Sequence, residues 1–163
     1  MAKKKMISEI LELTAKCESQ EERSEFLKRN YSIPLITILR GGFDDSVVWN
    51  LPKGTPPYRK DDAPKGYEPS NLYKQQRRIG YFVKGGKGEA MSAVKRESLF
   101  ISILESLHPD EAELVIAMKD KKLVGKYKGV TEKLIRDTWP NLIQAKVSVK
   151  KSEKKADKEK NED

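Results

Sequence analysis

Apolar residues three or four positions apart dominate the N-terminal part of the chain, and this is the spacing of helices with one buried face. The first stripe covers Ile7 to Lys16 and continues to Cys17, a small apolar side chain that is expected to pack in the core. Ser19 and Glu22 form a capping-box pattern, which is typical of a helix start. A second helix is therefore predicted from Ser19 to about Arg29.

A third helix is predicted to begin at Ser32, with Pro34 in its first turn and Gly41-Gly42 at its end. The segment Val47 to Trp49 is short and rich in valine, so a brief extended piece and a helical turn are both consistent with it. Leu51 to Pro69 contains five of the eight prolines and is expected to form an irregular surface connection.

Three further helices are predicted after this connection. Ser70 is expected to cap the first, which runs to Val83 and stops at Gly85-Gly86. Glu89 to Leu107 is expected to form the central core helix, and Pro109-Asp110-Glu111 is an acidic helix start. The buried stripe of the central helix is predicted to contain Met91, Val94, Ile101, Leu104 and Leu107.

These elements, with a last helix from Val130 to Thr138, predict an all-α fold: a bundle of about six or seven helices with a long proline-rich connection. Residues 1–143 form the expected domain. Residues 144–163 have almost no large apolar side chains and many charges of both signs, so a disordered tail is expected there. No apolar run is long enough to span a bilayer and no signal-peptide pattern is present, so a cytoplasmic location is expected.

The balance of charge indicates the kind of partner. The 163 residues contain 33 Lys and Arg against 25 Asp and Glu, which gives a net charge of +8 and a pI near 9.4. A polyanion is therefore the partner that electrostatics favours first.

Residues for catalysis or metal binding are scarce. Cys17 and His108 are the only cysteine and histidine, too few for a structural zinc site, and His108 is expected at the surface or as a helix cap. Gly80 to Lys87 resembles a phosphate-binding loop only in composition, because Gly-Lys is not followed by Ser or Thr. The pairs Asp44-Asp45 and Asp61-Asp62 are expected in caps and turns. No cofactor is expected, and an enzyme is the least favoured class.

The segment from Lys119 to Ile143 carries the strongest candidate chemistry. It places a lysine-rich loop with two glycines directly before the last helix, so ammonium groups and backbone N–H groups are expected to meet at a phosphate site. A solvated turn is the alternative interpretation. The candidate residues in this segment are Lys121, Lys122, Lys126, Tyr127, Lys128, Gly129, Thr131 and Lys133.

A second basic group accompanies aromatic residues. Arg77 and Arg78 follow Tyr73 and Lys74 and precede Tyr81, a mixture that suits contacts to phosphate and sugar. A solvated helix face explains the two arginines equally well.

The end of the helical region resembles a known family. Gly129-Val130-Thr131, Leu134-Ile135 and Trp139-Pro140-Asn141-Leu142-Ile143 look like the end of the N-terminal helical DNA-binding domain of ATP-dependent DNA ligases, especially the T-even bacteriophage type. Ile10 to Thr14 and Phe26 to Asn30 are similar to the first two helices of that domain. The resemblance covers roughly Ile7 to Ile143 and is weak between Leu51 and Gly88. A further likeness, to an uncharacterised protein type of contractile-tailed phages of marine bacteria, supplies no function.

The resemblance implies an all-helical module, of phage origin, that holds duplex DNA through backbone contacts largely across the minor groove. Gly129 and Thr131 would lie at the phosphate, and Lys126 and Lys128 are added as neighbours on electrostatic grounds. The family's ligases attach AMP to the lysine of a Lys-x-Asp-Gly motif, and this chain contains no Asp-Gly dipeptide. The expected function is therefore non-catalytic duplex-DNA binding in phage DNA replication, repair or packaging.

Two other functions stay open. The helical body could be an adaptor that docks on a replication or transcription protein such as a sliding clamp or polymerase. It could also be a minor virion or head-assembly protein.

Overall fold

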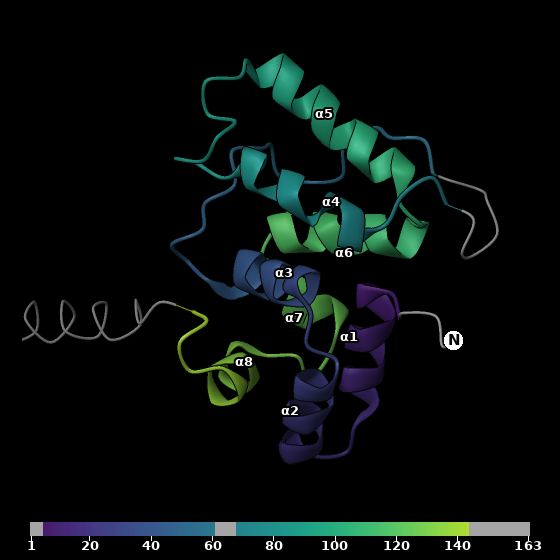
Figure 1. The fold of residues 1–163 in the computed structure, drawn as a ribbon, viewed down its shortest axis with the longest axis vertical. Coiled ribbons are helices and arrows are strands. Elements are labelled where there is room, and N and C mark those ends of the chain that lie inside the picture. Colours follow the sequence, from purple (N-terminus) through teal and green to yellow (C-terminus); the bar gives the residue numbers. More distant parts are fainter. Residues whose placement is uncertain (1–4, 61–67, 144–163) are drawn as a thin grey trace, which may run out of the picture.

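The computed structural model describes residues 5–60 and 68–143 and confirms the all-α fold over that part of the chain (Figure 1). The described residues form eight α-helices: α1 (Ile7–Lys16), α2 (Gln20–Arg29), α3 (Ile33–Phe43), α4 (Leu72–Ile79), α5 (Ala93–Ser106), α6 (Pro109–Lys119), α7 (Leu123–Lys126) and α8 (Glu132–Thr138). A 3-10 helix, η1 (Gly80–Phe82), follows α4, and an isolated antiparallel β-bridge joins Trp49 to Val83. Val47 to Trp49 is therefore an extended piece. The tail expected at 144–163 lies outside the described residues.

The first two helices begin where the sequence predicted. The Ser19 hydroxyl accepts a hydrogen bond from the Glu22 N–H, so the N-cap of α2 is confirmed. The stripe assigned to α1 is partly wrong, because Leu13 is 38% exposed and Cys17 is only half-buried at the C-cap. The buried face of α1 consists of Ile7, Ser8, Ile10, Leu11 and Thr14.

The start of α3 was predicted correctly but its end was not. The Ser32 hydroxyl accepts from the Leu35 N–H, and Pro34 lies in the first turn. The helix then continues through Gly41-Gly42 to Phe43. A Cβ on Gly41 would lie 2.6 Å from the Trp49 ring, so the glycines here permit close packing and do not end the helix.

The cap of α4 is Asn71, whose side chain accepts from the Lys74 N–H, and not Ser70. The α-helix also ends earlier than predicted, at Ile79, and η1 covers the next turn. The Ser70 N–H instead donates to the Ser106 carbonyl, which ties the start of this segment to the end of α5.

The prediction of a central helix at 89–107 was wrong in place and only partly right in phase, since Leu104 and Leu107 are buried as predicted. Val94 is 77% exposed, Met91 and Ile101 are only half-buried, and the buried side chains of α5 are Arg96, Phe100, Ile103 and Leu104. Figure 1 shows α5 at one edge of the molecule. The helix at the centre is α6, which packs against α1, α3, α5 and α7.

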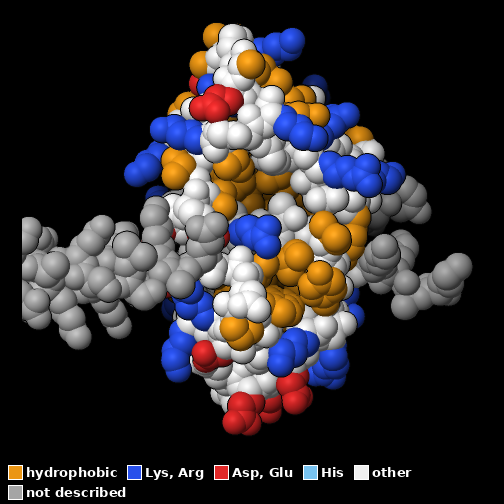
Figure 2. Space-filling model, turned by 60° about the vertical axis from the view of Figure 1, so that its left-hand side comes forward, with side chains coloured by type: hydrophobic (Ala, Val, Ile, Leu, Met, Phe, Trp, Pro, Cys, Tyr) orange, Lys and Arg blue, Asp and Glu red, His pale blue; other side chains and the backbone are white. Residues whose placement is uncertain are grey.

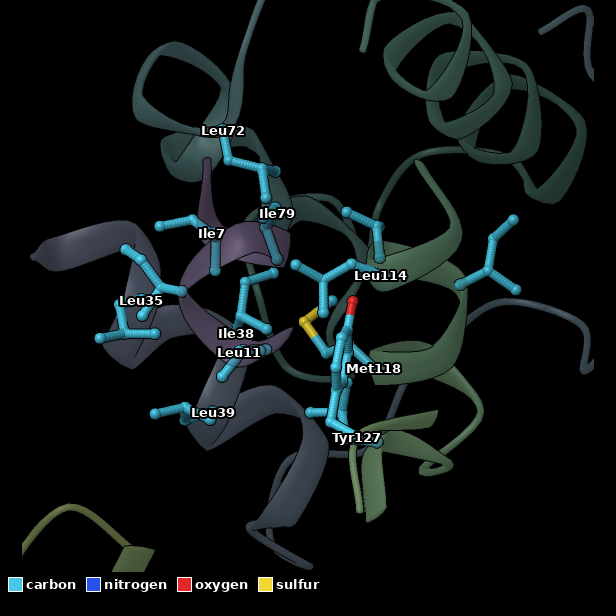
Figure 3. Packing of buried hydrophobic residues seen from close by; sticks show 14 of the residues in the cluster. Ile7, Leu11, Leu35, Ile38, Leu39, Leu72, Ile79, Leu114, Met118 and Tyr127 are labelled. Atoms are coloured by element: carbon cyan, nitrogen blue, oxygen red, sulfur yellow. The ribbon is translucent and has the colours of Figure 1, made fainter. Parts of the chain in front are cut away.

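Figure 3 shows how α6 joins the core, where Leu114 and Met118 lie among side chains of α1, α3 and α4. The helix starts as predicted at Pro109, and the His108 side chain accepts from the Asp110 N–H as a cap. Glu111 is buried and accepts hydrogen bonds from the backbone N–H groups of Ile7 (3.0 Å) and Ser8 (2.8 Å). It therefore caps α1 from a distant part of the sequence. Burial raises the pKa of this carboxyl, and the two N–H groups partly offset the effect.

Candidate functional site

The lysine-rich segment begins with a tight turn after α6. The Lys122 N–H donates to the Ala117 carbonyl (2.8 Å) and the Lys121 N–H donates to the Met118 carbonyl (3.1 Å), which is the Schellman pattern for a helix C-terminus. Lys121 has φ +58°, so it occupies the left-handed position that glycine usually takes. The turn fixes the backbone at Lys121 and Lys122, the first two candidate lysines.

Lys121 is exposed as a residue, but its ammonium group is bound by the fold. Its ammonium group donates to the carbonyls of Gly41 (2.7 Å) and Asp44 (2.9 Å), so it caps the C-terminus of α3. Burial lowers the pKa of Lys121, and the nearby carboxylates of Asp45 and Asp44 partly offset this effect. Its ammonium group is therefore already engaged at the C-terminus of α3.

Lys119, which the sequence did not single out, is a second lysine whose ammonium group binds backbone carbonyls, and it is buried. Its side chain is 2% exposed, and its ammonium group donates to the carbonyls of Pro52 and Gly54 and to Asp120 (2.6 Å). The Asp120 carboxylate also accepts from the Gly54 N–H. The pair pins the start of the proline-rich connection, whose described residues, up to Lys60, contain neither helix nor strand.

Tyr127 is part of the core and not of the surface. It is 3% exposed, and burial, together with the nearby acidic residues Glu111 and Glu12, raises the pKa of its hydroxyl. Its phenol hydroxyl has no hydrogen-bond partner among the described residues. The prediction of Tyr127 as a surface contact is therefore wrong, because its side chain is buried.

The turn after α7 is held at both ends. Tyr127 and Val130 are buried, and the Val130 N–H donates to the Tyr127 carbonyl at 3.0 Å. Gly129 has φ +93° at the third position, as a type II turn requires. Lys128 and Gly129 consequently form the tip of a turn whose ends are fixed in the core.

Four candidate lysines differ in what they bind. Lys126 pairs with Glu113 at 3.2 Å and its ammonium group lies 5.7 Å from the centre of the Tyr127 ring. Lys133 is exposed and lies 3.9 Å from Asp137. Lys122 and Lys128 are exposed and have no hydrogen bond or ion pair from their side chains to any described residue. These two carry the least neutralised charge of the segment.

Thr131 is the N-cap of α8. Its hydroxyl oxygen accepts from the Leu134 N–H at 3.1 Å, so part of the free N–H character expected at this helix start is already satisfied. The helix begins at Glu132, two residues after the predicted start.

Arg77 and Arg78 lie apart from the lysine turn, by which we mean the segment from Lys121 to Gly129. Both are exposed on α4, which packs on α3, whereas α8 packs on α2. Figure 1 shows α4 and α8 on opposite sides of α3. The two basic groups therefore form separate surfaces.

A shallow pocket of about 770 Å³ brings several lysines together. Lys121, Lys122 and Lys126 line it. Lys60 of the proline-rich connection lines it too, although no pattern in the sequence singled it out. Lys60 lies 3.9 Å from Glu113, the carboxylate that also pairs with Lys126. Figure 2 shows one face of the molecule, on which Lys and Arg side chains surround an apolar hollow, while most of the acidic side chains lie toward the lower end.

The fold and these contacts define a small helical protein with a rigid, lysine-bearing surface turn. The chain belongs to the family of unknown function DUF6433, whose model matches residues 10–125. A search of curated proteins found no match. Within the part of the chain that the structure describes, no helix is both long and apolar enough to cross a membrane, and no three His, Cys, Asp or Glu side chains are grouped to hold a metal ion.

Proposed function

We propose that this chain is a non-catalytic duplex-DNA-binding protein that acts in phage DNA replication, repair or packaging, in the cytoplasm of the infected cell. The lysine turn would contact the phosphate backbone, as the resemblance to the ligase DNA-binding domain implies. The observation that carries the proposal is that Lys122 and Lys128 are exposed, pair with no described residue, and lie on a backbone fixed by buried neighbours.

Rigid placement matters for affinity. Leu123, Tyr127 and Val130 are 1%, 3% and 0% exposed, so the backbone between the two lysines needs little further ordering on binding. Each phosphate that a lysine neutralises releases condensed counterions and steepens the salt dependence by close to one unit. The net charge of +8 adds long-range attraction. Binding of this kind tolerates any sequence, because phosphates carry no base information.

The test uses the double variant Lys122→Glu/Lys128→Glu and duplex DNA in fluorescence anisotropy at several salt concentrations. We expect the plot of log affinity against log salt to become less steep by about two units, equally for unrelated sequences. The matched control is Lys87→Glu/Lys95→Glu, which makes the same charge change at exposed lysines before and in α5. Intact, nicked, gapped and single-stranded DNA would define the preferred structure.

Unchanged salt dependence in the first variant, or an equal change in the control, would remove the lysine turn from the interface. If the wild-type chain does not bind DNA even at low salt, the proposed function itself fails.

A protein-interaction adaptor is the second candidate, and one surface favours it. Tyr31 and Ile33 are 56% and 55% exposed beside a pocket that Tyr73 also lines, and Tyr31 packs edge-on against Trp139. Exposed aromatic and apolar side chains that lie together are common in docking surfaces. An adaptor would not shift with duplex DNA at moderate salt, and pull-down from infected cells would yield one stoichiometric partner. Mass spectrometry of purified particles would test the virion alternative.

A further inference from the structure

Arg23 of α2 lies against the tip of the lysine turn. A Cβ built on Gly129 would be 2.9 Å from the Arg23 Nε, 3.0 Å from Cζ and 3.2 Å from Nη2. Three atoms of the guanidinium are thus nearly equidistant from that point, so the planar group lies flat against the glycine. A Cβ at this position would press on the guanidinium and displace it, and the backbone at φ +93° itself favours glycine.

This guanidinium has no partner in the described part of the chain. Its Nε is buried without a hydrogen bond, and Arg23 makes no ion pair there. The carboxylates of the facing helix α8 are used elsewhere: Glu132 pairs with Arg136, and Asp137 accepts from Gln20. A half-buried cation that is left unpaired is costly, so its retention calls for an explanation.

We propose that Arg23, Lys128 and the Gly129 backbone form a phosphate-binding site, which takes one phosphate of the DNA backbone. The site deepens the proposed function and rests on it. Gly129 lets the guanidinium lie against the main chain at the tip of the turn. Lys128 supplies an ammonium group one residue away, and the planar guanidinium suits two oxygens of one phosphate. The site joins α2 to the turn before α8, two segments that the sequence holds far apart.

The experiment measures duplex-DNA affinity against salt for wild type, Arg23→Gln and Arg23→Lys. We expect Arg23→Gln to lower the salt slope by about one unit and the affinity by roughly eightfold at 0.1 M salt, which is the effect of one phosphate contact. Arg23→Lys should keep the slope, because it keeps the charge, while it loses affinity through the lost two-point geometry. A purely structural Arg23 would shift the unfolding midpoint and leave the slope unchanged.

The matched control is Arg29→Gln, the same substitution at the exposed end of α2. A second variant, Gly129→Ala, should displace the guanidinium and lower the slope as Arg23→Gln does. The inference is overturned if Arg23→Gln leaves the slope at the wild-type value, or if Arg29→Gln lowers it equally.

Tripolyphosphate separates this inference from the proposed function. It should raise the thermal unfolding midpoint of the wild type and not that of Arg23→Gln. If that holds while duplex DNA does not bind, the anion site stands and the proposed function fails. If neither probe binds, both fail.

Discussion

Two pairs of lysines in one short segment have opposite surroundings. The ammonium groups of Lys119 and Lys121 each donate to backbone carbonyls of distant segments, whereas those of Lys122 and Lys128 contact no described partner. The tight turn at Lys121 separates the two pairs along the chain. A lysine-rich run is therefore not one cationic surface, because some of its ammonium groups hold segments of the fold together.

The ion pair of Lys119 and Asp120 ties the start of the proline-rich connection to the end of α6. Lys119 donates to two carbonyls that accept no hydrogen bond from the backbone of a described helix or strand, and the Asp120 carboxylate neutralises its ammonium group. Such a pair is expensive to break, since removal of one partner leaves the other charge buried. Lys122 and Lys128, the external pair of lysines, make no such contact with any described residue.

The largest effect is therefore expected from Lys119→Met. This variant leaves Asp120 buried without its cation and the carbonyls of Pro52 and Gly54 without a donor, so we expect a loss of about 3 kcal/mol in the free energy of unfolding. Urea denaturation followed by circular dichroism measures it. Lys122→Met is the control, and a loss below about 1 kcal/mol in Lys119→Met would contradict the contrast between the pairs.

Lys121 allows the side-chain contacts to be separated from the backbone geometry. Lys121→Met loses both bonds to the end of α3 and keeps the left-handed backbone, so we expect a loss of about 1.5 kcal/mol. Lys121→Gly loses the same bonds but removes the steric cost at φ +58°, and should be about 1 kcal/mol more stable than Lys121→Met. Equal stability of the two variants would show that the left-handed backbone carries no such cost.

The same residue predicts a pH dependence. Burial lowers the pKa of Lys121 below its ordinary value of 10.5, so between the two values the unfolded chain binds more protons than the folded chain. Stability then rises with pH in that window, and the advantage of the wild type over Lys121→Met should grow as pH approaches 10.5. An advantage that shrinks would mean that the neighbouring carboxylates dominate over burial.

The sequence predicted elements whose signals are local. Ser19 and Ser32 cap helices as expected, because a cap needs only a side-chain oxygen and an N–H a few residues away. Gly41-Gly42 was misinterpreted, since a glycine that ends a helix and one that admits a neighbour look alike in sequence. The phase of α5 was only partly right for a related reason: Arg96 is buried because it binds the carbonyls of Asn50, Gly88 and Met91, and no periodicity of apolar residues shows that.

The candidate site divides in the same way. The clustering of lysines and the turn at Gly129 follow from composition and could be predicted. The burial of Tyr127, the internal use of Lys121 and the nearness of Arg23 and Lys60 depend on contacts between distant segments. For Arg23 the sequence offered no signal at all beyond a charged position in a polar helix.

The smallest effect on stability is expected from substitutions of the external pair, Lys122 and Lys128. Lys122→Gln and Lys128→Gln remove charges that contact no described partner, so each should change the free energy of unfolding by less than about 0.5 kcal/mol. The same two variants should each lower the salt slope of DNA binding by about one unit. Urea denaturation and anisotropy titration on the same samples measure both quantities. Loss of stability above about 1 kcal/mol in either variant would show that these lysines belong to the structural pair, and the division of the segment into two functions would then be wrong.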